Sequence, residues 1–174
     1  MDIKKKYCNV QLTPEHKSAE KIKRFLTKNS NVIYEQKFGF HTTVHYSEEI
    51  PIFPRQPVLE NIRKLLPIKL SPDTYRIDVF GEDVLVLRYE SETIEKVNWM
   101  IINEGLRQCI CEWPDRLSDE ELQRLRESPF IRKSPVYLDF NPHITLARNF
   151  DIENLEKIGC LEESITFDNF KWIL

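Results

Sequence analysis

Apolar and polar residues alternate along several short stretches of this chain, the pattern of strands with one buried face. Residues 7–12 alternate in this way. Residues 75–80 and 84–89 do so on either side of Gly81-Glu82-Asp83, which predicts a β-hairpin. Further strands are expected over residues 38–46 and 140–147, and two short ones over 165–167 and 170–173 around Asp168-Asn169.

Apolar residues at helical spacing predict helices between these strands. One begins at Thr13-Pro14, with Thr13 as N-cap and Pro14 in the first turn, and runs to about Lys28. The longest covers residues 91–113, and short helices are expected near 58–66, 118–121 and 152–157. The rest of residues 48–74 is proline-rich and is expected to be irregular. With the chain length, this order of elements predicts a single α+β domain.

Composition narrows the class of protein. The 174 residues are 41% hydrophobic and 30% charged, and none of the apolar runs approaches the length of about 18 residues that a membrane span needs. The start of the chain has no apolar segment typical of a secretion signal.

The four cysteines lack CxxC spacing and are interpreted as reduced thiols, so we expect a cytoplasmic protein. The four glycines cannot form a glycine-rich phosphate loop or a dinucleotide fingerprint.

The net charge of −3 hides an asymmetry along the chain. Residues 1–70 carry 13 Lys and Arg against 7 Asp and Glu, whereas residues 71–174 carry 12 against 21. An acidic total is not typical of a protein that binds long nucleic acids. The basic first part could still attract a small polyanion to one wall of a cleft.

Two of the four histidines begin the same short motif, His-x-Thr followed by an apolar residue. The motifs are His41-Thr42-Thr43-Val44 and His143-Ile144-Thr145-Leu146, and each lies in an expected strand. Residues i and i+2 of a strand point to the same face, so each histidine shares a face with a threonine. Either motif alone is common on a polar strand face, but two copies predict a functional pair.

The other two histidines carry less weight. His45-Tyr46-Ser47-Glu48 begins as a similar motif, but Glu48 stands where an apolar residue is expected. Residue 45 is expected on the face of His41 and Thr43, at most at the edge of the site. His16 lies in the first turn of an expected helix, where a surface position is the simpler interpretation.

The chemistry of the pair is that of an acid and a base. A neutral imidazole can accept a proton from an attacking hydroxyl while a protonated one donates to a leaving oxygen. The hydroxyls of Thr43 and Thr145 can donate to phosphate oxygens. Neither motif is bracketed by HExxH, CxxC or a carboxylate triad, so we expect no metal and no cofactor. The sequence leaves open which histidine is the base.

The two motifs and their flanks, Phe40 to Val44 and Pro142 to Arg148, resemble the paired motifs of the 2H phosphoesterase superfamily. Its members include bacterial RNA 2′,3′-cyclic phosphodiesterases, also called 2′-5′ RNA ligases, and phage anti-CBASS phosphodiesterases that destroy cyclic-oligonucleotide signals. The phage group is the more similar in three further features: Tyr46-Ser47, the hairpin from Val79 to Leu87 and the long helix. Residues 142–148 are equally similar to the RNA enzymes.

The resemblance implies a two-lobed α+β fold of antiparallel sheets with flanking helices, one His-x-Thr strand per lobe and a central cleft. It implies a hydrolase that cleaves 3′-5′ phosphodiester bonds of a cyclic oligonucleotide, a counter-defence activity in the host cytoplasm if the chain is encoded by a phage. The alternatives are RNA-end processing and a non-catalytic nucleotide-binding sponge. The charged segment 114–135 departs from a compact member of the family and is interpreted as an insertion.

Three further residues are candidates for substrate contacts. Tyr7 and Asn9 lie on the polar face of the first strand, beside which a central site would lie, and Tyr7 could stack on a base. A solvent-facing strand surface explains them about as well. Arg148 follows the second motif and could hold a phosphate, or it could be a surface residue that ends the strand.

Overall fold

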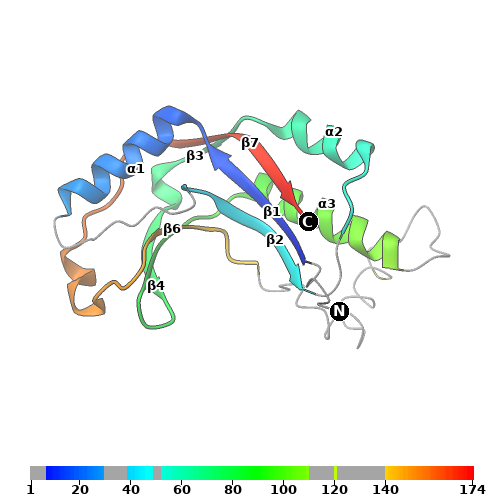
Figure 1. Ribbon diagram of the computed structural model, residues 1–174. Helices are drawn as coiled ribbons and strands as arrows, with labels where there is room; N and C mark the ends of the chain where they lie inside the picture. Colours follow the sequence, from blue (N-terminus) through cyan, green and yellow to red (C-terminus); the bar gives the residue numbers. More distant parts are fainter. Residues whose placement is uncertain (1–6, 30–38, 49–51, 110–119, 121–139) are drawn as a thin grey trace.

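The computed structural model describes residues 7–29, 39–48, 52–109, 120 and 140–174 (Figure 1). Seven strands form one antiparallel sheet in the order β3-β7-β1-β2-β6-β5-β4. The strands are β1 (Tyr7–Pro14), β2 (Thr42–Glu48), β3 (Ile68–Leu70), β4 (Arg76–Phe80), β5 (Val84–Arg88), β6 (His143–Ala147) and β7 (Ile165–Ile173). The helices are α1 (His16–Lys28), α2 (Gln56–Leu65) and α3 (Glu92–Cys109), with 3₁₀ turns η1 (Pro72–Thr74) and η2 (Ile152–Lys157).

The predicted α+β class and the β4–β5 hairpin are confirmed. The sheet is curled (Figure 1), and it holds both histidine motifs on neighbouring strands, β2 and β6. A two-lobed arrangement is not shown in the described residues and stays a prediction. The expected helix at 118–121 and most of the segment 114–135 lie outside the described residues.

The predicted bounds of the first strand, the first helix and the last strands are wrong where β1 and β7 pair. β7 is one continuous strand, because Asn169 pairs with Thr13 and the register then shifts past Asp168, which has no opposite residue in β1. For the same reason Thr13 and Pro14 belong to β1, and Glu15 is the N-cap of α1. The Glu15 backbone N–H donates to the carbonyl of Thr166 at 2.8 Å. The contact of this part of the chain with β7 therefore continues to the start of α1.

Two smaller expectations are also corrected. Residues 68–70, expected to be irregular, form β3 because they pair with the first three residues of β7. Residues 152–157 form a 3₁₀ turn, with the Asp151 carboxylate accepting from the Glu153 backbone N–H at 3.1 Å. Both local structures depend on a partner that the hydrophobic pattern does not reveal.

The core lies between one face of the sheet and the helices. Apolar side chains of β1, β5, β6 and α3 belong to one buried cluster, and full burial of each such side chain contributes about 1.5–3 kcal/mol. Fully buried members are Leu12, Leu85, Leu87, Ile144, Ile94, Val97 and Ile101. α3 contacts β2 directly, so this packing fixes the helix relative to the strand of the first motif. Within the described residues, the helices are too short or too polar to cross a membrane.

Candidate active site

The two histidine motifs lie side by side in the sheet. β2 and β6 are antiparallel, with Thr42 opposite Ile144, and both of these side chains are buried. The antiparallel register then sets His41 across from Thr145 and Thr43 across from His143. The side chains of both histidines and of Thr43 and Thr145 therefore lie on one face of the sheet, the histidine face, and all four are partly exposed. Thr42 and Ile144 point to the opposite, buried face. The structure brings together the residues that the sequence predicted.

The two imidazoles are diagonal neighbours across this strand pair. Diagonal residues of an antiparallel pair have Cβ atoms up to about 7–8 Å apart. That spacing leaves room for a phosphate group between two rings that reach toward it.

Each imidazole is oriented by a backbone carbonyl two residues earlier. Nδ1 of His41 lies 3.1 Å from the carbonyl oxygen of Gly39, and Nδ1 of His143 lies 2.8 Å from that of Asn141. A carbonyl only accepts hydrogen bonds, so Nδ1 must carry the hydrogen in both rings. The neutral rings therefore present an unprotonated Nε2, which can accept a proton and return it.

Gly39 has a conformation that favours glycine. Its φ is +72°, in the left-handed region that other residues adopt at a cost. This turn aims the Gly39 carbonyl at His41. The glycine is part of the support of the first histidine, which the sequence reasoning missed.

Thr42 joins the two motifs. Its buried hydroxyl donates to the backbone carbonyl of His143 at 2.7 Å, so a side chain of the first motif holds the main chain of the second. The sequence pattern assigns no role to Thr42, the x position of the first motif. In the structure, its hydrogen bond fixes the backbone of His143 relative to the first motif.

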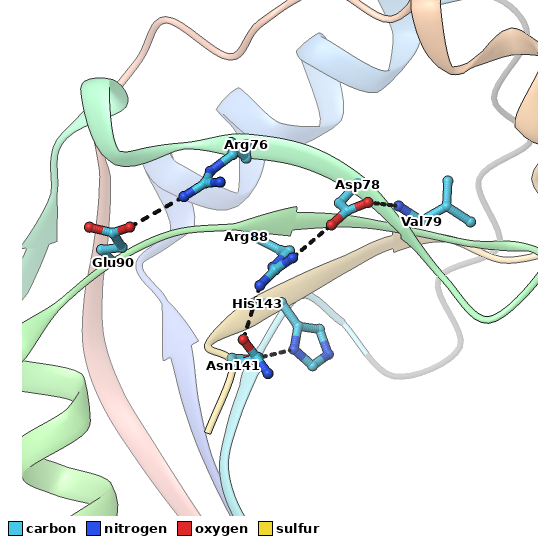
Figure 2. Close-up of polar contacts among 7 residues, drawn as sticks. All are labelled: Arg76, Asp78, Val79, Arg88, Glu90, Asn141 and His143. Carbon is cyan, nitrogen blue, oxygen red and sulfur yellow. Dashed lines mark hydrogen bonds and ion pairs between the residues drawn. The ribbon is translucent and has the colours of Figure 1, made fainter. Parts of the chain in front are cut away.

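Arg88 supports the second motif from β5 (Figure 2). Its guanidinium donates to the Asp78 carboxylate at 2.8 Å and to the side-chain oxygen of Asn141 at 3.0 Å. Arg88 and the Val79 backbone N–H hold the pKa of Asp78 below its usual value. Because Asn141 also receives Nδ1–H of His143, the Arg88 network fixes the residue that orients this ring.

Phe80 packs beside the second histidine. Its ring lies edge-on to that of His143, with centroids 4.6 Å apart, and the Arg88 guanidinium lies 5.8 Å from the centroid of Phe80. The imidazole of His143 is therefore restrained by a ring contact as well as by its hydrogen bond. The sequence marked Phe80 only as a hairpin residue.

The pKa values of both motif histidines lie below the ordinary value of 6.5. Burial is the main cause in each case, and the hydrogen bond to the carbonyl opposes it. The charges of Lys171 and Arg148 lower the pKa of His41 further, and those of His41 and Arg88 lower that of His143. Burial therefore favours neutral imidazoles, and a bound anion would favour a proton on one of them.

The other predicted contacts fall around this centre. Asn9 lies opposite Tyr46, and Gln11 lies opposite Thr43, so the polar face of β1 continues the histidine face of β2. Arg148 is exposed but close enough to lower the pKa of His41. The Tyr7 backbone pairs with that of Glu48, whereas the Tyr7 side chain lies outside the described residues.

Lys171 is a cation that the sequence reasoning missed. It lies on β7 opposite Gln11, in the row of residues that leads to Thr43. Arg148 and Lys171 thus place positive charge near His41. No local pattern could have identified Lys171, because its position depends on the pairing of β7 with β1.

His45 is not on the face predicted for it. The register between β1 and β2 shifts so that Val10 lies opposite His45 while Gln11 lies opposite Thr43, which leaves Val44 as an extra residue. This β-bulge turns His45 to the buried face of Val10, where it is 4% exposed. Asn98 of α3 donates its side-chain amide to the Val44 carbonyl at the bulge.

A cavity of about 410 Å³ adjoins the second histidine. It is lined by residues of β2, β4, α3 and the segment that leads into β6, so it reaches from the histidine face to α3. The lining residues are Thr43, Val44, His45, Tyr46, Phe80, Asn98, Phe140, Asn141 and His143.

In the described part of the chain, no three His, Cys, Asp or Glu side chains are grouped so that they could hold a metal ion. Comparison with protein-family models finds no match, and comparison with curated protein sequences finds none either.

Proposed function

We propose that the protein is a metal-independent phosphodiesterase in which His41 and His143 act as an acid and base pair. The observation that carries the proposal is the antiparallel register that sets each motif's histidine across from the other motif's threonine. Both rings also have Nδ1 against a carbonyl, which leaves Nε2 for proton transfer. Such a symmetrical arrangement suits the transfer of a proton on each side of one phosphate.

The reaction needs only these groups and a hydroxyl nucleophile. Nε2 of one histidine takes the proton of water or of a ribose 2′-hydroxyl as its oxygen bonds to phosphorus. The bond from phosphorus to the leaving oxygen breaks, and the protonated second histidine donates its proton to that oxygen. The hydroxyls of Thr43 and Thr145 donate to the nonbridging oxygens as their negative charge grows.

The preferred substrate is a cyclic oligonucleotide, as the resemblance to anti-CBASS enzymes implies. Positive charge at Arg148 and Lys171 beside His41 supports a ligand with more than one phosphate. The single residue pair between β2 and β6 supports the finer proposal that the sheet divides there into the two lobes of a 2H phosphoesterase.

The test is turnover of cyclic di- and trinucleotides, with RNA ending in a 2′,3′-cyclic phosphate assayed in parallel. We expect His41→Ala and His143→Ala each to lower turnover about 10²–10⁴-fold. The double variant should lose much less than the product of the two, because the residues act as a unit. His16→Ala is the matched control, because His16 is exposed on α1.

The outcomes separate the candidate functions. Cleavage of RNA ends alone would replace the cyclic-oligonucleotide proposal with RNA-end processing. Recovery of intact nucleotide from a denatured complex, without turnover, would support sequestration. Near-full turnover by His143→Ala would refute the paired-histidine mechanism.

A further inference from the structure

The cavity beside His143 has an inner wall whose chemistry the reaction does not use. Tyr46, Phe80 and Phe140 contribute aromatic rings to its lining, and His45 and Asn98 contribute buried polar groups. Aromatic side chains are the surfaces on which planar heterocycles stack, and they tolerate any base. The lining therefore combines stacking surface with hydrogen-bonding groups next to a reacting imidazole.

His45 is the polar group in this wall without a partner. Its Nε2 is buried and makes no hydrogen bond within the described residues. A buried polar atom left unpaired costs free energy, so such atoms normally have a protein, water or ligand partner. Burial also lowers the pKa of His45 to about 4, so the ring is neutral at physiological pH.

The position of His45 follows from the backbone. The bulge at Val44 turns His45 away from the histidine face, and the amide of Asn98 holds the carbonyl of Val44. A simple strand would have left residue 45 beside His41 and Thr43. The bulge thus separates His45 from the acid and base pair and directs it to the wall of the cavity.

We propose that this cavity binds a nucleobase of the substrate, with Nε2 of His45 hydrogen-bonded to the edge of the base. The inference rests on the proposed function, since a nucleotide whose phosphate lies at His143 carries its base within reach of the adjoining cavity. A volume of about 410 Å³ suits one base with part of its ribose. His45 is a specificity residue in this scheme and takes no part in proton transfer.

The test compares binding of AMP, GMP, CMP and UMP with binding of ribose 5-phosphate, which lacks a base, by titration calorimetry. We expect at least one nucleotide to bind ten times more tightly than ribose 5-phosphate, because base stacking and the hydrogen bond are added. His45→Leu should reduce that advantage about three- to tenfold and leave the affinity for ribose 5-phosphate unchanged. His16→Leu is the control and should change neither.

Equal binding of all four nucleotides and ribose 5-phosphate would overturn the proposal, as would an unchanged advantage in folded His45→Leu. If His45→Leu fails to fold, the wild-type protein still gives an answer through the ¹⁵N chemical shift of His45 Nε2. That shift should move when the tightest nucleotide is added, and an unmoved shift overturns the proposal. These readouts require no turnover. If nucleotides bind through His45 but neither the cyclic oligonucleotides nor the cyclic-phosphate RNA ends are cleaved, the proposed function is refuted and the base site stands.

Discussion

The buried His45 should make the stability of the protein fall steeply as the pH drops below 6.5. Its pKa is lowered from 6.5 to about 4, with burial as the cause. The unfolded chain therefore binds a proton between these pH values that the folded chain does not, so the free energy of unfolding decreases as the pH falls through this window. Each pKa unit corresponds to about 1.4 kcal/mol, so the full effect approaches about 3 kcal/mol. Between pH 7 and pH 5 the loss is about 2 kcal/mol.

The assay is urea unfolding of the wild type and of His45→Gln at pH 7 and pH 5, followed by tryptophan fluorescence. These values lie on either side of the isoelectric point of about 5.9, where solubility is poorest. Other titrating groups are common to both proteins and cancel in the comparison. The wild type should lose about 2 kcal/mol more than His45→Gln. His16→Gln should follow the wild type, because His16 is exposed. If His45→Gln loses as much stability as the wild type, His45 is not a buried neutral imidazole.

Four further outcomes follow from the site. Because the pKa values of His41 and His143 are both lowered, the bell-shaped profile of kcat/KM against pH should have its maximum below pH 6.5. A maximum above pH 7.5 would contradict this. Thr42→Val should cost about 1 kcal/mol in urea unfolding and also lower turnover, because the His143 carbonyl loses its donor. Unchanged stability would mean that this hydrogen bond contributes nothing. Gly39→Ala should cost about 1–2 kcal/mol at φ +72° and reduce turnover, whereas Gly39→Asn should be milder. EDTA should leave turnover unchanged, and activity restored by a divalent ion after chelation would refute metal independence.

The local pattern predicted the site better than it predicted its surroundings. His41 and Thr43 share a face because they are two residues apart in a strand, and the same is true of His143 and Thr145. The repeated motif predicted that the two strands contribute to one site. Their place as neighbours in one sheet was not predicted, since the alternation of apolar residues does not specify partners.

What the sequence could not predict depends on register between distant strands. The β-bulge at Val44 exists only relative to β1, and it decides that His45 is buried. Lys171 and Arg88 approach the histidines through pairings with β1 and β6. The continuous β7 has the same origin, because Asn169 pairs with Thr13 and Asp168 is accommodated by a register shift within the strand.

The pairing of β7 between β1 and β3 has a consequence for the order in which the protein folds. β1 leads into the first half of the site, yet its neighbour on one side is a strand made roughly 160 residues later, with Asn9 opposite Ile173. Closing so long a loop is entropically costly, and chains dominated by such distant pairings fold slowly. The β4–β5 hairpin can form early, because its strands are joined by a short turn. The pairing of β1, the strand next to β2, is then completed late, after the last strand of the sheet has been synthesised.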